Sequence, residues 1–144
     1  MVKYSRQREC ILKNLQERRD HPTADMVYES VRVEQPNISL GTVYRNLSFL
    51  AQNGQILKLT TGIGPDRFDG CTAPHIHFIC RTCGNVIDME DIPQRRLVER
   101  ASAQFDGIIE GYDLQLFGKC GECLSINKRN DSESHREAFR TDSE

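Results

Sequence analysis

The spacing of apolar positions predicts three helices within the first 55 residues. Between about Ser5 and Arg18, apolar side chains recur every three or four positions, as they do on one face of a helix. A second helix is expected after Thr23, a residue type suited to the N-cap, and it ends before Pro36. The inward positions of these two helices are Tyr4, Ile11, Leu12, Leu15, Val27 and Val31.

The third predicted helix runs from Leu40 to about Gln52 and has two unlike faces. Ser39 is expected to cap its first turn, and Gly54 is expected to end it. The inward stripe consists of Val43, Leu47 and Leu50. The opposite stripe is polar and consists of Gly41, Tyr44, Arg45, Ser48 and Gln52.

A pair of short strands is predicted to follow. Gln55–Thr61 reads as a strand, residues 61–66 as a turn and Arg67–Asp69 as the start of a return strand. Three helices and a two-stranded ribbon predict a winged helix-turn-helix, in which the third helix contacts DNA. The alternative is a small helical bundle without a partner. The candidate DNA contacts are Tyr44, Arg45 and Asn46, with Thr42 as a weaker fourth.

The second half of the chain is predicted to be a small α/β domain. Residues 75–90 and 109–118 alternate as strands do, and between them Pro93 opens a helix that is expected to cover the sheet. The fold class is therefore α+β, with a winged-helix domain in residues 1–70 and a second domain in residues 71–126. The polar residues 127–144 are expected to be disordered. The apolar positions of the covering helix are Leu97, Val98, Ala101 and Phe105.

Composition and charge narrow the class of protein. Of 144 residues, 38% are hydrophobic and 28% charged, as in a soluble globular protein. No window approaches the roughly 18 apolar residues of a membrane-spanning helix, and the N-terminus lacks a signal-peptide core, so a cytoplasmic protein is expected. Residues 1–60 carry nine Lys and Arg against six Asp and Glu, whereas the rest carries ten against fifteen. This asymmetry suggests that the N-terminal part binds a polyanion.

Two Cys-x-x-Cys pairs predict a structural zinc site. Cys80 with Cys83, and Cys120 with Cys123, each place two thiolates on one tight turn, and two such turns can close a tetrahedral four-thiolate site. A thioredoxin-type redox pair, an iron centre for electron transfer and four buried thiols are the alternatives. Cys10 and Cys71 lie outside these pairs; Cys71 is expected to be a small hydrophobic residue, with a secondary thiol target as the alternative.

The histidines suggest a second metal site. His75 and His77 lie two positions apart on one predicted strand, so both imidazoles project from the same face. His21, Asp69 and Asp88 are the other candidate ligands, and together the five would leave an open coordination position. Taken singly, each of these three has an ordinary explanation as a loop or surface residue. His135, in the polar tail, is expected to be solvated.

Five blocks of the chain, in order, resemble the ferric-uptake-regulator (Fur) superfamily of bacterial metal-dependent repressors. The resemblance covers about residues 4–125 and is greatest to the peroxide-sensing PerR branch. The blocks are His21–Asp25 (HPTAD), Ser39–Leu47 (SLGTVYRNL), Arg67–Asp69 (RFD), His75–Gly84 (HIHFICRTCG) and Cys120–Cys123 (CGEC).

The resemblance implies a homodimer that binds double-stranded operator DNA, with one structural Zn²⁺ per chain on the paired cysteines. It also implies one regulatory Fe²⁺ or Mn²⁺ per chain on the five ligands His21, Asp69, His75, His77 and Asp88. Aspartate at position 88, where iron-sensing relatives usually carry glutamate, is associated with peroxide sensing. On that branch His21 or His75 is oxidised to 2-oxo-histidine, and the repressor then releases its metal and its DNA.

These ligands belong to both halves of the chain, so a bound ion would fix the angle between the winged helix and the dimer. Two recognition helices would then lie about 34 Å apart, one DNA turn. We therefore expect a peroxide-responsive repressor and not an enzyme. The alternatives are a repressor of the same superfamily that senses metal alone, a small non-haem iron enzyme, and a zinc-ribbon scaffold without a regulatory metal.

Overall fold

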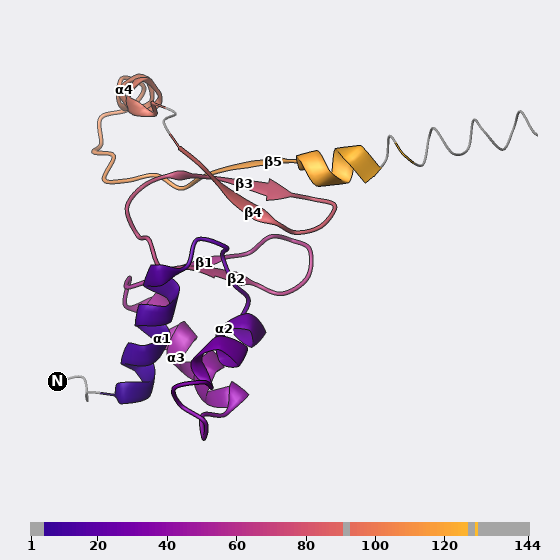
Figure 1. The fold of residues 1–144 in the computed structure, drawn as a ribbon. Helices are drawn as coiled ribbons and strands as arrows, with labels where there is room; N and C mark the ends of the chain where they lie inside the picture. The colour runs from indigo at the N-terminus through magenta and orange to yellow at the C-terminus, as the bar shows by residue number, and fades with distance from the viewer. Residues whose placement is uncertain (1–4, 91–92, 127–128, 130–144) are drawn as a thin grey trace, which may run out of the picture.

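The N-terminal half of the protein is built from three capped helices (Figure 1). The computed structural model describes residues 5–90, 93–126 and 129. The helices are α1 (Arg6–Glu17), α2 (Ala24–Val31) and α3 (Leu40–Gln52). The side-chain oxygens of their N-caps, Ser5, Thr23 and Ser39, each accept a hydrogen bond from a backbone N–H three residues on. The three predicted helices and the predicted N-caps Thr23 and Ser39 are thus confirmed, and Ser5 is a further N-cap.

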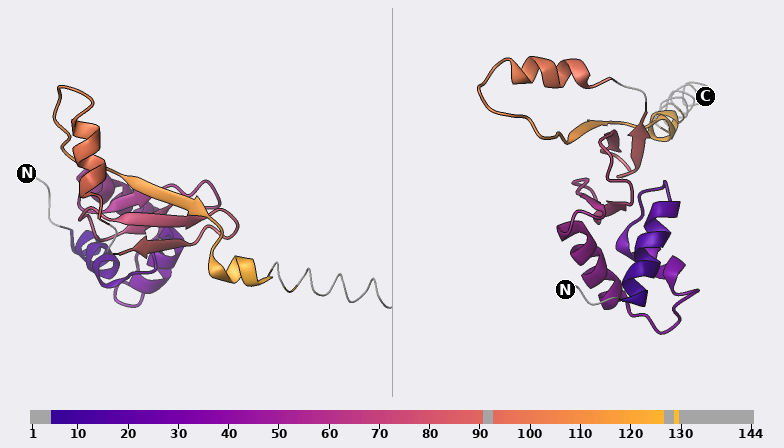
Figure 2. Two further views of the ribbon diagram at one scale, coloured as in Figure 1. Left: turned by 90° about the horizontal axis from the view of Figure 1, so that it is seen from above. Right: turned by 90° about the vertical axis from the view of Figure 1, so that its left-hand side faces the viewer.

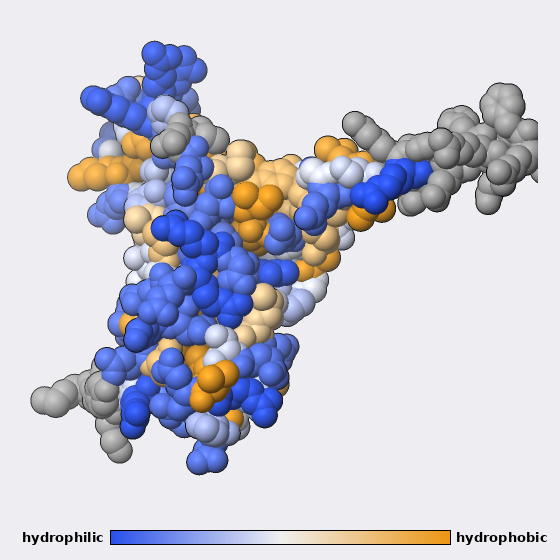
Figure 3. Space-filling view, viewed as in Figure 1, coloured by the Kyte–Doolittle hydropathy of each residue, from blue (hydrophilic) through white to orange (hydrophobic). Residues whose placement is uncertain are grey.

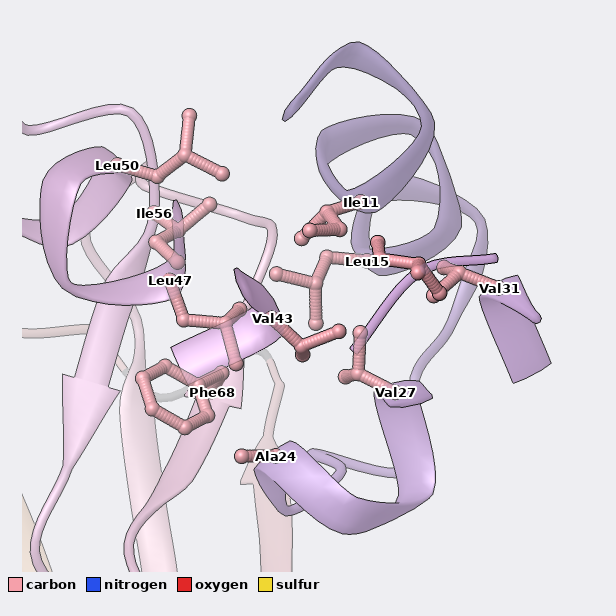
Figure 4. Packing of buried hydrophobic residues seen from close by; sticks show 11 residues of the cluster. Ile11, Leu15, Ala24, Val27, Val31, Val43, Leu47, Leu50, Ile56 and Phe68 are labelled. Atoms are coloured by element: carbon pink, nitrogen blue, oxygen red, sulfur yellow. The ribbon is translucent and has the colours of Figure 1, made fainter. Parts of the chain in front are cut away.

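The apolar faces of the three helices meet in one core, which Phe68 closes from the wing (Figure 4). Ile11 and Leu15 of α1 are almost fully buried there, while Leu12 packs at the margin. The predicted stripe of α3, with Leu47 at its centre, also faces inward. Tyr4, a further predicted core position, lies outside the described residues.

The ribbon that follows α3 is shorter than predicted but has the expected topology. β1 (Leu57–Leu59) pairs antiparallel with β2 (Arg67–Asp69), and Leu57 lies opposite Asp69. Gly54 has a φ of 71°, which glycine adopts without steric cost, and it turns the chain out of α3 into the ribbon. The winged helix-turn-helix arrangement is confirmed.

The second half contains a three-stranded sheet in the order β4-β3-β5 (Figure 2). The central strand β3 (Ile76–Cys80) pairs antiparallel with β4 (Val86–Met89) and parallel with β5 (Leu114–Gly118). In this register His77 lies opposite Asp88. The predicted α+β class is confirmed.

The predicted covering helix forms, but it does not cover the sheet. α4 (Arg95–Ser102) begins two residues after Pro93, and none of its residues is buried. Figures 1 and 2 show α4 standing away from the sheet, and Figure 3 shows hydrophobic surface near α4 and over the strands. Leu97 and Phe105 remain about half exposed. Periodicity correctly predicted the helix, but it contains no information on which surface the apolar face would meet.

Contacts between the wing and the sheet join the two halves. Leu59 of β1 packs with Ile79 of β3 and Val86 of β4 in a small buried cluster. At Gly70, a Cβ atom would lie 2.6 Å from the backbone carbon and oxygen of Leu15, so the chain passes very close to α1 directly after β2.

Within the described residues, no helix has the length and apolar character needed to cross a membrane.

Candidate metal centres and nucleic-acid interface

The four paired cysteines converge at one end of the sheet. Cys80 ends β3, Cys83 lies in the turn that follows, and Cys120 and Cys123 come after β5. Their sulfurs lie within 4.8 Å of one another. The Sγ atoms of Cys80 and Cys123, and those of Cys83 and Cys120, are 3.8 Å apart. That separation is far beyond a disulfide bond, and it equals the edge of about 3.8 Å of a tetrahedron with Zn–S bonds of about 2.3 Å.

The electrostatics of this cluster favour a bound cation. A backbone hydrogen bond from Cys120, with a second from Cys83, lowers the pKa of the Cys80 thiol to about 6, so its thiolate form is favoured. The neighbouring thiol of Cys120, together with burial, raises the pKa of Cys123 to about 12. Four thiols packed this closely cannot all ionise beside one another unless a cation compensates their charge. The donor set therefore fits Zn²⁺.

The three histidines and two aspartates also converge, although they come from four separate segments. His21 lies between α1 and α2, and Asp69 ends β2. His75 immediately precedes β3, His77 lies on β3, and Asp88 lies on β4. One ligand atom from each lies within 4.8 Å of the other four. The winged helix and the sheet thus both contribute to this cluster.

The donor atoms of this cluster have the separations of ligands around a single ion. The Nε2 atoms of His21, His75 and His77 lie 3.4, 3.0 and 2.9 Å from Asp69 Oδ2. The same three nitrogens lie 2.9, 3.1 and 3.4 Å from Asp88 Oδ1. Neighbouring ligands of an ion with bonds of about 2.1 Å are about 3 Å apart.

Hydrogen bonding alone does not satisfy these groups. His75 Nδ1 lies 2.7 Å from the carbonyl oxygen of Ala73, which only accepts, so Nδ1 carries the proton and Nε2 of the neutral ring presents a lone pair to the carboxylates. One oxygen of Asp69 faces three imidazole nitrogens but has only two lone pairs. A cation at the centre would take one lone pair from each of the five donor atoms, and mixed imidazole and carboxylate ligation fits Fe²⁺ or Mn²⁺.

The charges within this cluster also favour a bound cation. Burial lowers the pKa of His21, but the hydrogen bond to Asp69 and the charge of Asp88 outweigh it and leave that pKa raised. Burial raises the pKa of Asp69, but hydrogen bonds from His21 and His77 hold it far below its usual range. The aspartate therefore stays ionised and draws positive charge toward the imidazoles.

The cluster is closed on one side and open on the other. The side chains of His21 and His77 are 2% exposed, whereas those of His75 and Asp88 are 19% and 22% exposed. Neither His21 Nδ1 nor His77 Nδ1 has a hydrogen-bond partner among the described residues. A small molecule from solvent therefore reaches the site from the side of His75 and Asp88.

The predicted DNA contacts on α3 separate into two groups. Tyr44 and Arg45 are exposed, and the Arg45 guanidinium donates to the hydroxyl of Thr42 at 3.0 Å. Asn46 is buried instead: its Oδ1 accepts from Arg8 Nε at 3.2 Å and its Nδ2 donates to the carbonyl of Thr42. Asn46 links α3 to α1, because its position one residue past Arg45 turns it toward the helical core.

Comparison with known proteins identifies the relatives of this chain. The family model described as the ferric uptake regulator family matches residues 1–117. The chain belongs to the ferric uptake regulator family. It is 37% identical over 123 residues to the "Peroxide operon regulator" of Bacillus subtilis, covering 85% of this chain and 84% of that protein. It is equally similar to the "Peroxide-responsive repressor PerR" of Staphylococcus aureus, with 85% and 82% covered.

Solved structures of the family share the fold. The ferric uptake regulator of Helicobacter pylori matches with a TM-score of 0.74 and 27% identity, over 85% of this chain and 83% of that one. The Campylobacter jejuni peroxide stress regulator matches with a TM-score of 0.72 and 29% identity, over 81% and 88%. Family membership makes this chain a DNA-binding transcriptional regulator and excludes the reading as a non-haem iron enzyme.

Two residues near the metal cluster had no role in the sequence analysis. The carbonyl of Ala73 fixes the tautomer of His75, and Arg67 donates to the carbonyl of His21 at 3.2 Å. Nothing in the sequence indicates the backbone contact of Ala73. Arg67 had a signal, because it begins the RFD block that ends in Asp69, but its contact with His21 spans 46 positions.

Proposed function

We propose that this protein is a peroxide-responsive, metal-dependent repressor, whose metal-loaded dimer binds operator DNA and releases it on oxidation. The observation that carries the proposal is the convergence of five donor atoms from the winged helix and the sheet on one point. The structural Zn²⁺ would be held by Cys80, Cys83, Cys120 and Cys123. The regulatory Fe²⁺ or Mn²⁺ would be held by His21, Asp69, His75, His77 and Asp88.

The two halves of the chain would have different functions, DNA binding and dimer formation. Residues 1–70 would bind DNA through Tyr44 and Arg45, with Thr42 orienting Arg45. Residues 71–126 would form the dimer, which is supported by the exposed apolar side chains of α4 and by β5, whose second edge is unpaired in the described part of the chain. The tail at 127–144 lies outside the described residues, apart from Arg129.

The metal ligands couple binding at one site to the geometry at the other. His21 and Asp69 belong to the DNA-binding part, whereas His77 and Asp88 belong to the sheet. Holding all of them at one point selects one angle between the two parts, and only the arrangement with correctly spaced recognition helices binds the operator. Metal and DNA therefore increase each other's affinity.

Peroxide sensing would use the open side of the cluster. A bound Fe²⁺ would catalyse cleavage of the peroxide O–O bond, with the histidine ring supplying the two electrons overall, whereas Mn²⁺ does little of this chemistry. The net change inserts one peroxide oxygen at the C2–H bond of His21 or His75, while the other peroxide oxygen leaves as water. Both ring nitrogens of the product are amide-like N–H groups without a lone pair to donate, so the oxidised residue no longer holds a metal.

The deciding experiment measures operator binding before and after peroxide. An operator is first selected from random duplexes with the Mn²⁺-loaded chain, and its binding is then followed by fluorescence anisotropy. We expect both metal-loaded forms to bind and only the Fe²⁺ form to release DNA after peroxide. Mass spectrometry should then find one added oxygen on the peptide that contains His21 or His75. Unmodified peptides and retained DNA would refute peroxide sensing.

Asp88→Glu is the matched variant for this experiment, because it keeps the carboxylate and adds one methylene. We expect it to bind the operator with either metal and to release DNA less readily on peroxide treatment. A variant that responds to peroxide as the wild type does would remove Asp88 from the sensing step.

A repressor that senses metal alone is the second candidate. It is supported by the similar likeness of this chain to the Helicobacter pylori and Campylobacter jejuni proteins, at 27% and 29% identity. Under this alternative, a chelator releases the operator and peroxide with Fe²⁺ does not, so the same measurement separates the two.

A further inference from the structure

His21 holds a backbone conformation that L residues rarely adopt. Its φ is 49°, and no other non-glycine residue in the described part of the chain has a positive φ. The left-handed region brings Cβ close to the following carbonyl oxygen, and a residue before proline normally prefers an extended conformation. Something outside the local sequence therefore stabilises His21 in this form.

The stabilising contacts come from β2. The Arg67 guanidinium donates through Nη1 to the carbonyl oxygen of His21 at 3.2 Å. The backbone N–H of Phe68 donates to the carbonyl oxygen of Pro22 at 2.9 Å, and Thr23 forms an antiparallel bridge with Arg67. Residues 21–23 thus run alongside β2 and are joined to it by this hydrogen bond and one isolated bridge.

This arrangement lets one strand position two members of the metal cluster. Asp69 ends β2 and contributes its own carboxylate, while Arg67, two residues earlier, fixes the backbone from which the His21 imidazole extends. His21 Nε2 then lies 3.4 Å from Asp69 Oδ2. Contacts within the protein thus position both groups, which is the preorganisation that a tight site requires.

Among the described residues, the hydrogen-bond partner of the Arg67 guanidinium is the carbonyl oxygen of His21. Within residues 5–90, 93–126 and 129, the contacts of the half-buried Arg67 side chain include no ion pair with a carboxylate. The contact with His21 is therefore not a by-product of a salt bridge elsewhere. An arginine is long enough to reach across from β2 and supplies several donors on a planar group.

We propose that Arg67 is a positioning residue of the regulatory metal site, which holds His21 in its left-handed conformation and so sets the affinity for the regulatory ion. This inference rests on the proposed function. It assigns to Arg67 an effect on metal binding that does not require DNA, because the contact lies on the backbone of a ligand.

The test compares Arg67→Met with the matched control Arg81→Met in the zinc-loaded full chain without DNA. Methionine keeps an unbranched side chain of moderate length and removes every donor. Arg81 lies in the turn after β3, where its guanidinium stacks 4.5 Å from the centre of the Phe117 ring, outside the cluster. Mn²⁺ affinity is measured from the electron paramagnetic resonance signal of free Mn²⁺. We expect binding about 10- to 100-fold weaker in Arg67→Met, as for lost groups that support a metal ligand, and unchanged in Arg81→Met.

A double-mutant cycle with His21→Ala separates positioning from general destabilisation. If Arg67 acts through His21, Arg67→Met causes no further loss of Mn²⁺ affinity once His21 is alanine. An equal loss in both backgrounds would overturn the inference. Should Arg67→Met fail to fold or retain zinc, Arg67→Lys, which keeps the charge but not the planar group, is put through the same cycle.

The two hypotheses fail differently. A wild-type chain that binds Mn²⁺ together with an Arg67→Met variant of equal affinity overturns only the role of Arg67. A zinc-loaded wild-type chain that binds neither Mn²⁺ nor Fe²⁺ overturns the proposed function and this inference with it.

Discussion

Gly70 illustrates how a single residue ties the metal ligands to the helical core. It follows Asp69 directly, and a side chain there would meet the backbone of Leu15 and Gln16 at 2.6 to 2.7 Å. Backbone atoms cannot move aside as the end of a flexible side chain can. Glycine is therefore required here by the close approach of α1 to the end of β2. The same approach holds the end of β2, and with it Asp69, against α1.

Gly70→Ala should lower the free energy of unfolding by about 1–3 kcal/mol, because the added methyl group forces α1 and β2 apart. Urea denaturation of the zinc-loaded chain measures the change. Gly111→Ala is the matched control, since nothing lies within 4 Å of a Cβ atom at that position. Equal denaturation midpoints for the two variants would contradict this account of Gly70.

At the scale of elements, α3 combines a buried packing face with the exposed face that we propose contacts DNA. Val43 and Leu47 are fully buried against α1 and α2, and Asn46 bonds to Arg8, whose guanidinium also stacks 3.9 Å from the centre of the Phe49 ring. These contacts hold α3 rigidly against α1. The opposite face, with Tyr44 and Arg45, stays exposed and is free to enter a major groove.

Arg45→Ala is expected to weaken operator binding. If the guanidinium contacts a base edge, the loss is about 1–3 kcal/mol and is specific to the operator; if it contacts a phosphate, the loss is similar for every DNA sequence. Anisotropy titrations at fixed salt, on the selected operator and on an unrelated duplex, distinguish the two cases. Arg32→Ala removes an exposed arginine at the end of α2, which pairs with Glu29, and serves as the control. Unchanged affinity for both duplexes would remove Arg45 from the interface.

For the whole molecule, the important feature is that two separately packed parts meet at a few points. The helical core excludes the three-stranded sheet, and three of the four paired cysteines, Cys80, Cys120 and Cys123, form their own small core with Phe78. Between them lie the small cluster around Leu59 and the His–Asp cluster. The angle between the parts therefore depends on relatively few contacts, which is the property that a metal-controlled switch requires.

Removal of the regulatory ion with a mild chelator, leaving zinc in place, should loosen the junction and not the cores. We expect backbone hydrogen exchange to accelerate at residues 21–23, 67–69 and 86–89, while α1, α3 and β3 near the cysteines keep their protection. Exchange followed by mass spectrometry, with and without Mn²⁺, measures this. Acceleration spread evenly over the chain would mean that the ion stabilises the whole fold and does not act on the angle.

The sequence by itself determined the local structure and much of the chemistry. Helices α1 to α3 follow from apolar periodicity, and α2 and α3 also from Thr23 and Ser39 as caps, all of which depend on residues a few positions apart. The two Cys-x-x-Cys pairs likewise specify half of a metal site within one turn each. His75 and His77 share a face because side chains on a strand alternate.

Only the tertiary structure decided which of these local features meet. It brings His21 to within 2.9 Å of Asp88 across 67 positions, buries Asn46 against Arg8, and leaves α4 apart from the sheet that it was expected to cover. Arg67 acquires its contact with His21 in the same way. Periodicity and spacing report on neighbours along the chain, whereas these contacts depend on how whole elements pack, which no short stretch of sequence encodes.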